Sequence, residues 1–198
     1  MSIDSHIQQI KDCGVIAILR GQFSIDDVLQ IADCLITNGI TVLEITMNSP
    51  AALGALPELQ KRFGDSALIG AGTVRNLTDW EQAHQQGAVF TVAPNFDADI
   101  AKHSIEQDRL YLPGVATPGE AMIAKRAGCG VQKLFPIQAM GGTSYLKAIR
   151  GPLDDIDFIP VGGVSVDDLN DYFKFGAMAV GMGGSLVPSQ DWSLSTIA

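Results

Sequence analysis

The sequence predicts a single α/β domain, a (β/α)₈ TIM barrel that spans residues 1–198. Short apolar runs alternate with segments of helical periodicity about eight times, at intervals of roughly 20 to 26 residues. Nearly every predicted helix begins near Ser or Thr and ends near Gly, the residue types preferred at helix caps. No linker or change of composition divides the chain. A doubly wound open sheet is the alternative, but no GxGxxG motif follows the first strand.

An extra helix and four strand–helix units are predicted in the first half of the chain. Ile3, Ile7 and Ile10 share one face of residues 2–12, which predicts a short amphipathic helix ahead of the barrel. Apolar runs bounded by turn residues predict strands at 15–20, 41–46, 67–73 and 89–94. The helices that follow them are predicted to begin at Ser24, at Ser49 and Pro50, at Thr78 and at Asp97.

The second half continues the same alternation. Strands are predicted at 109–114, 131–136, 158–163 and 178–184. The helices between them are predicted to begin at Thr117 and Pro118, near Thr143, and at Ser165. Only residues 186–198 follow the last strand, so we expect either a short or truncated last helix, or coverage of that part of the barrel by the helix at 2–12.

Charge and composition restrict the partners of this domain. The formal net charge is −9, which argues against nucleic acid and anionic membranes, so an anionic ligand would need positive charge concentrated in its site. No apolar run approaches the roughly 20 residues of a membrane helix, and the N-terminus has no signal pattern. Cys13, Cys34 and Cys129 are scattered, as is typical of buried thiols in a cytoplasmic protein.

Lys133 lies inside the predicted strand at 131–136 and shares a face with Val131 and Phe135. Burying an ammonium group is costly, and the protein can relieve that cost by lowering the lysine pKa. A neutral lysine amine is a nucleophile for carbonyl groups and can form a Schiff base. The alternative is a lysine at a strand end paired with a carboxylate, and this strand alone favours neither.

Two more charged residues lie on the first two predicted strands. Arg20 shares a face with Ile16 and Ile18, so its guanidinium points into the barrel mouth if the isoleucines fill the barrel. Arginine suits a carboxylate or a phosphate. Glu44 lies inside an apolar run, where burial raises a carboxyl pKa and allows proton transfer near neutral pH. The alternatives are a surface ion pair for Arg20 and an internal ion pair for Glu44 with Lys133 or Arg20.

Glycine-rich loops follow the last two predicted strands. Backbone N–H groups in such loops can cradle a phosphate, and barrels commonly bind phosphate at these two positions. Two tight β–α turns are the alternative. Thr73, after a glycine turn on the third strand, adds a hydroxyl group. The residues of the predicted phosphate cradle are Gly162, Gly163, Gly183, Gly184 and Ser185.

Together these residues predict Schiff-base chemistry on a small phosphorylated keto acid. Lys133 would attack the ketone, and Glu44, directly or through a water, would carry the protons for cleavage of a C–C bond. This chemistry needs no metal or organic cofactor. His6, His84 and His103 fall in predicted helices and lack the spacing of a metal site.

Two other classes of protein remain open at this point. A barrel isomerase or synthase that acts on a phosphorylated metabolite would use the glycine loops, but it has no need for Lys133 in a buried strand. A non-catalytic phosphometabolite-binding barrel predicts that Lys133→Met keeps both the fold and the ligand affinity, and that the parent protein catalyses nothing.

Eight segments, in order, resemble the 2-keto-3-deoxy-6-phosphogluconate / 4-hydroxy-2-oxoglutarate (KDPG/KHG) aldolase family. They are GVIAILRG (14–21), LEITMNSP (43–50), IGAGTV (69–74), APN (93–95), LPGVATPGE (112–120), VQKLFP (131–136), PVGGV (160–164) and MGGSL (182–186). The resemblance covers nearly the whole chain and departs only at the short C-terminus. It implies a class I aldolase that cleaves a 2-keto-3-deoxy-6-phospho sugar acid to pyruvate and glyceraldehyde 3-phosphate, with unphosphorylated 4-hydroxy-2-oxoglutarate as an alternative substrate. Family members are typically homotrimers.

The resemblance also implies roles for individual residues. The family's Schiff-base lysine matches Lys133, and its proton-shuttling glutamate matches Glu44. Its carboxylate-binding groups match Arg20 and Thr73, its pocket-lining residues match Pro94 and Phe135, and its phosphate loops match Gly162, Gly163, Gly183, Gly184 and Ser185.

Two positions resemble the family branch that acts on the galactonate epimer. Asn48 stands where phosphogluconate-type members usually carry an arginine, four residues after the glutamate, and Val161 stands where they tend to carry a threonine. A threonine hydroxyl can hydrogen-bond to one configuration of a C4 hydroxyl, and valine cannot. We therefore hypothesise relaxed or galactonate-leaning stereoselectivity.

Overall fold

The computed structural model describes residues 2–188 and 192–193 as an alternation of helices and strands. The helices are α1 (Ile3–Cys13), α2 (Ile25–Thr37), α3 (Ala52–Phe63), α4 (Leu77–Gln85), α5 (Ala98–Glu106), α6 (Pro118–Arg126), α7 (Thr143–Arg150) and α8 (Leu169–Lys174), with short 3₁₀ turns at Gln138–Met140 and Val166–Asp168. The prediction of a last helix after residue 186 falls mostly on residues 189–191 and 194–198, which lie outside the described residues. Within the described part of the chain, no helix is both long and apolar enough to cross a membrane.

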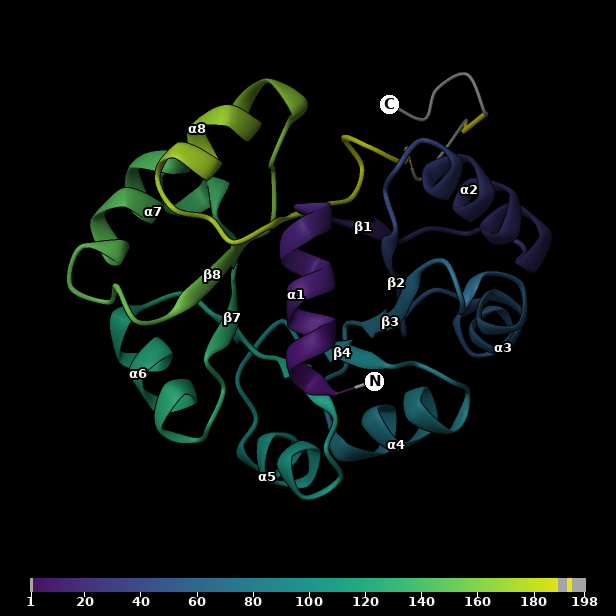
Figure 1. The fold of residues 1–198 in the computed structure, drawn as a ribbon, viewed down its shortest axis with the longest axis horizontal. Coiled ribbons are helices and arrows are strands. Elements are labelled where there is room, and N and C mark those ends of the chain that lie inside the picture. The colour runs from purple at the N-terminus through teal and green to yellow at the C-terminus, as the bar shows by residue number, and fades with distance from the viewer. Residues whose placement is uncertain (1, 189–191, 194–198) are drawn as a thin grey trace.

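The strands form a curled parallel sheet surrounded by helices, an α/β barrel-like fold. They are β1 (Val15–Leu19), β2 (Val42–Thr46), β3 (Leu68–Gly72), β4 (Phe90–Val92), β5 (Leu110–Leu112), β6 (Gly114–Val115), β7 (Val131–Leu134), β8 (Asp157–Pro160) and β9 (Val180–Met182). Six strands pair in the order β5-β4-β3-β2-β1-β9, and three pair in the order β6-β7-β8. In Figure 1 helices α2 to α8 surround these strands, and α1 crosses in front of them.

The links between the six-stranded and the three-stranded sheet include two that lie at strand ends. The first is Pro113, which separates β5 from β6 along one extended segment and accepts a hydrogen bond from the Lys133 N–H at 2.9 Å. A proline breaks the ladder there because it has no N–H to donate. The second is a single parallel bridge between Val161 and Gly181, which connects the end of β8 with β9.

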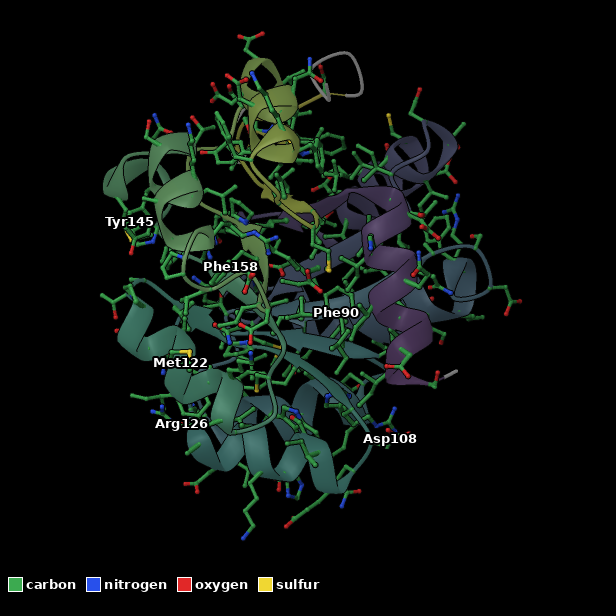
Figure 2. The ribbon with its side chains drawn as sticks, turned by 60° about the vertical axis from the view of Figure 1, so that its left-hand side comes forward. Phe90, Asp108, Met122, Arg126, Tyr145 and Phe158 are labelled. Atoms are coloured by element: carbon green, nitrogen blue, oxygen red, sulfur yellow. The ribbon has the colours of Figure 1, made fainter. Side chains whose placement is uncertain are left out.

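Alternating side chains on the strands divide the apolar residues into two clusters. The inner cluster gathers the residues that face the middle of the curled sheet, such as Ile16, Ile18 and Phe90, whereas Ala17 and Leu19 belong to the outer cluster beneath the helices. Figure 2 shows Phe90 in the middle of the molecule, while Met122 and Arg126 lie on the peripheral helix α6. The shared face predicted for Ile16 and Ile18 is therefore confirmed.

Helix α1 covers the amino-terminal ends of the strands. Its Ile10 is fully buried in the inner cluster, and Ile3 and Ile7 pack against the same cluster. The Ser2 side chain accepts a hydrogen bond from the Ser5 N–H and caps this helix, and Gly14 ends it in a left-handed conformation with φ 73°. The predicted extra helix thus supplies the apolar floor of the barrel-like sheet.

Several predicted helix starts are confirmed and others shift by a few residues. Ser24 and Thr117 form capping boxes with Asp27 and Glu120. Helix α4 is capped by Asn76, not by the predicted Thr78, because the Asn76 side chain accepts from the Asp79 N–H. Of the three cysteines, only Cys129 is buried, while Cys13 and Cys34 are half-buried free thiols.

Candidate active site

A cavity of about 620 Å³ opens at the carboxyl-terminal ends of β7, β8, β9 and β1. Parallel strands place the residues that follow them at this one end, which is where barrel enzymes carry their functional groups. Its lining consists of Ile18, Arg20, Gly21, Gln22, Lys133, Phe135, Val161, Gly162, Gly163, Val164, Ser165, Gly181, Gly183, Gly184 and Ser185.

Lys133 reaches this cavity from the inner face of β7. Its side chain is only 4% exposed, and its Nζ lies 4.9 Å from the centre of the Phe135 ring. Burial lowers the pKa of Lys133, and the nearby Arg20 lowers it further, while Glu44 acts in the opposite direction. The geometry therefore favours a neutral, nucleophilic amine at the cavity wall.

Glu44 is buried on β2 and is 2% exposed. Burial raises the pKa of Glu44, and the positive charges of Lys133 and Arg20 oppose that rise. Its Oε1 atom has no hydrogen-bond partner among the described residues. The carboxyl group lies against Gly72 of β3, where a Cβ atom would collide with Oε1. A buried carboxyl group with a raised pKa is suited to passing protons near neutral pH.

The alternative for Glu44, an internal ion pair with Lys133 or Arg20, is not formed in the described residues. Neither Lys133 nor Arg20 has a salt bridge within 4.0 Å to a carboxylate there. Charge interactions still act on the pKa values of two of these groups: Lys133 and Arg20 lower that of Glu44, while Glu44 raises and Arg20 lowers that of Lys133. Without a direct salt bridge between them, the Lys133 amine and the Glu44 carboxyl both remain available to a third molecule.

Arg20 and Thr73 are brought together as the sequence predicts. The Arg20 guanidinium donates a hydrogen bond to the Thr73 Oγ1 at 3.0 Å across the ends of β1 and β3. Thr73 has φ 57°, a left-handed conformation that β-branched residues rarely adopt. Strain of this kind persists where the surroundings impose it, and it concentrates at functional sites.

Both glycine loops line the same cavity. Gly162 and Gly163 have φ values of 97° and 87°, which favour glycine strongly, and a Cβ on Gly162 would press on the Phe135 ring at 3.1 Å. The structure records no partner for the backbone N–H groups of Val164 and Ser185 within the described part of the chain. The same holds for the N–H groups of Gly163 and Gly184. Such unpaired donors suit an anion.

Not every predicted site residue lies on the main cavity. Pro94 lines a smaller neighbouring cavity of about 210 Å³, which shares the Phe135 ring with the large one. Glu44 and Thr73 are absent from the lining of the large cavity. Thr73 accepts a hydrogen bond from the lining residue Arg20, and Glu44 interacts electrostatically with the lining residues Lys133 and Arg20. Asn48 is exposed in the loop after β2.

Sequence reasoning missed several lining residues. Gly21 and Gln22 follow Arg20 directly, and Ser165 follows the first glycine loop, so their proximity to predicted residues was the available signal. Gln22 was missed because a glutamine after a strand is also typical of a solvated loop.

The titratable residues elsewhere do not form a metal centre. Among the residues that the structure describes, no group of three or more His, Cys, Asp or Glu side chains could hold a metal ion. His84 and His103 instead stack against Trp80, with ring centroids 4.3 and 4.8 Å from the indole. Their role in the described structure is packing between α4 and α5.

Comparisons with known proteins point to one family. The family model described as "KDPG and KHG aldolase" matches residues 3–196. The chain is 37% identical over 172 residues to the 2-dehydro-3-deoxy-phosphogluconate aldolase of Pseudomonas aeruginosa, covering 84% of this chain and 78% of that protein. It is 34% identical over 173 residues to the 2-dehydro-3-deoxy-6-phosphogalactonate aldolase of Escherichia coli, covering 87% and 83%.

A solved structure matches the fold and the chemistry. The KDPG aldolase of Legionella pneumophila, with pyruvate captured as a covalent carbinolamine intermediate, superposes with a TM-score of 0.87 at 31% identity. The match covers 96% of this chain and 94% of that one. A covalent carbinolamine is the adduct that precedes a Schiff base.

Proposed function

We propose, because the chain belongs to the KDPG and KHG aldolase family, that it cleaves 2-keto-3-deoxy-6-phosphogluconate or its galactonate epimer to pyruvate and glyceraldehyde 3-phosphate. Membership makes the protein an aldolase, a carbon–carbon lyase of class I. The observation that carries the substrate proposal is the buried Lys133 in a cavity with unpaired loop N–H groups.

The bond-forming step begins at Lys133. Its neutral amine attacks the C2 ketone of the keto acid and gives a carbinolamine. Glu44, directly or through a water, donates a proton to the departing hydroxyl, so water leaves, a protonated imine forms and Glu44 becomes a carboxylate. Glu44, directly or through a water, removes the proton from the C4 hydroxyl. The C3–C4 bond then breaks, its electrons flow into the imine to give an enamine, and the aldehyde leaves.

The return half of the reaction uses the same groups. Glu44 delivers a proton, directly or through water, to C3 of the enamine, which regenerates the imine of pyruvate. Water then hydrolyses that imine, so pyruvate leaves and Lys133 returns as a free amine. The raised pKa of Glu44 and the lowered pKa of Lys133 support both directions of proton transfer.

The remaining cavity residues would bind the two charged ends of the substrate. Arg20 and Thr73 would hold the carboxylate, because the guanidinium supplies a charge and the hydroxyl supplies a hydrogen bond. The loops of Gly162 and Gly163 and of Gly183 to Ser185 would hold the phosphate through backbone N–H groups. This cradle favours a phosphorylated substrate over 4-hydroxy-2-oxoglutarate, which has no phosphate to fill it.

Val161 supports relaxed or galactonate-leaning stereoselectivity. Its side chain lines the cavity at the end of β8 and carries no hydroxyl. It therefore forms no hydrogen bond that would favour one configuration of the substrate's C4 hydroxyl. Comparable kcat/KM values on the two epimers, or a preference for the galactonate, would support this assignment. A strong preference for the gluconate epimer would contradict it.

The test of the aldolase mechanism is borohydride trapping with pyruvate, followed by intact mass and peptide mapping. We expect a stable adduct on Lys133 that is absent from Lys133→Met. If the folded parent protein gives no adduct with pyruvate in excess, Schiff-base chemistry at this cavity is wrong. Phosphate requirement is tested separately, by comparing cleavage of the phosphorylated acid with that of 4-hydroxy-2-oxoglutarate.

We also propose a closed barrel, a homotrimeric assembly and a cytoplasmic location for this protein. The Pro113 and Val161–Gly181 links support a closed (β/α)₈ barrel, which a crystal structure would test. Exposed apolar side chains on the outer helices, such as Ile105 and Ile123, support a homotrimer, which light scattering would test. The free thiols of Cys13, Cys34 and Cys129 support a cytoplasmic location.

A further inference from the structure

The cavity wall at the end of β1 is anchored from outside the cavity. Arg20, Gly21 and Gln22 line the cavity in an irregular segment between β1 and α2. Irregular backbone moves more easily than a strand, so a charged group carried by it needs a second attachment to keep its position. Among the described residues, the guanidinium of Arg20 has one hydrogen-bond partner, Thr73.

A buried hydroxyl pair after β2 provides the other attachment. The Gly21 N–H donates a hydrogen bond to the Ser49 Oγ at 3.3 Å, 28 residues further along the chain. Ser49 Oγ also lies 2.9 Å from the Thr46 Oγ1, and one of these two hydroxyls donates to the other. Ser49 is 7% exposed and Thr46 is fully buried. The pair is therefore shielded from water, which would otherwise compete for the Gly21 N–H.

The other explanation for Ser49 is a helix cap, and the structure does not support it. The sequence predicts that Ser49 and Pro50 open the next helix, but α3 begins at Ala52 with Ala51 in the N-cap position and no side-chain cap bond. The Ser49 side chain points instead to the end of β1. Its loop is fixed in turn to β3, because the Met47 N–H donates to the Gly72 carbonyl at 2.8 Å.

We propose that Ser49, supported by Thr46, is a positioning residue for the keto acid: it holds Gly21, and thereby the Arg20 guanidinium, where the substrate carboxylate binds. The inference rests on the proposed function, since it assigns Arg20 to the carboxylate. The side chain of Ser49 does not itself touch the cavity. It acts through Gly21, so its loss should weaken substrate binding rather than remove a reacting group.

The test compares Ser49→Ala, Ser49→Thr and the parent protein. We expect Ser49→Ala to raise KM for the keto acid, and the pyruvate concentration that half-saturates borohydride trapping, by about tenfold, with kcat within about threefold of the parent. Ser49→Thr keeps the hydroxyl and should restore both values. Ser104→Ala is the matched control: Ser104 is 1% exposed on α5, and its hydroxyl has no hydrogen-bond partner among the described residues.

A double-mutant cycle separates positioning from a general structural effect. In an Arg20→Ala background, Ser49→Ala should raise the half-saturating pyruvate concentration by less than about twofold, because the group it positions is gone. An unchanged value for Ser49→Ala in the parent background, or an equal rise in both backgrounds, would overturn the inference. If the parent itself forms no pyruvate adduct, the proposed function fails instead.

Discussion

The two ends of the curled sheet use the same inner strand faces for opposite purposes. At the amino-terminal end, α1 places Ile3, Ile7 and Ile10 on the inner apolar cluster. At the carboxyl-terminal end, the same faces carry Glu44 and Lys133, both buried and neither neutralised by a direct ion pair in the described residues. The difference indicates that one end is built for stability, and that it supports an end where the burial of two titratable groups opposes folding.

The largest expected effect on activity comes from removing the Lys133 amine at the carboxyl-terminal end of the sheet. Lys133→Met should lower kcat/KM by about 10⁴ or more, because no other residue can form the imine. The thermal midpoint should stay the same or rise, since a buried amine is replaced by an apolar side chain of similar length. Steady-state kinetics and calorimetry on the same sample measure both. If Lys133→Met were inactive because it had unfolded, the proposed difference in stability between the two ends of the sheet would be wrong.

Glu44→Gln should have the next largest effect on catalysis. We expect a loss of about 10² to 10³ in kcat, because the amide cannot accept or return a proton. The folded-state pKa of Glu44 is raised, so the stability associated with this group is present below its unfolded pKa and is lost as pH rises. The variant should therefore be more stable than the parent above about pH 4.3 and equal to it below. Urea unfolding across this pH range measures the difference.

Gly72→Ala tests whether the carboxyl of Glu44 needs its present position. A Cβ atom on Gly72 would collide with that carboxyl group, whereas Gly130 has open space around its Cα. Gly72→Ala should lower kcat by about tenfold or more, and Gly130→Ala should leave it unchanged. Equal kinetics for the two alanine variants would show that Glu44 tolerates displacement.

Ile10→Ala tests the amino-terminal end of the sheet, which helix α1 covers. The side chain is fully buried against the inner cluster, so its truncation should lower the free energy of unfolding by about 2 to 5 kcal/mol. The values of kcat and KM, measured well below the new melting temperature, should match those of the parent. A large change in kcat would mean that the two ends are coupled more tightly than their separate chemistry suggests.

The smallest expected effect is on the pH dependence of stability, and it comes from His84, which packs between helices α4 and α5. Burial lowers the pKa of His84 to about 4, although its ring hydrogen-bonds to the Ala88 carbonyl at 2.7 Å. A lowered pKa means that the stability is present above the ordinary histidine value and is lost as pH falls from about 6.5 toward 4. His84→Gln should flatten this slope, as measured by urea midpoints, without changing activity at neutral pH.

The sequence was sufficient to predict which strand side chains face the inside and the outside of the sheet, but not which contacts the loops make. Alternation placed Lys133 and Glu44 on the inner face because a strand permits only two side-chain directions. The role of Ser49 was missed, and it was expected at a helix start, because a serine before a proline predicts a cap and its bond to Gly21 is a contact 28 residues apart. Likewise, Pro94 lines a separate cavity that shares only Phe135 with the large one, a division of space that strand periodicity does not specify.

The division at Pro113 has a consequence for how the chain becomes active. Glu44 is carried by the six-stranded sheet, and Lys133 by the three-stranded one. Strand β9 comes from the C-terminal part of the chain yet pairs with β1. Neither sheet alone carries both residues of the proposed catalytic pair. On the proposed mechanism, turnover requires both sheets to be in place, so the onset of turnover during refolding would report when the two sheets have come together.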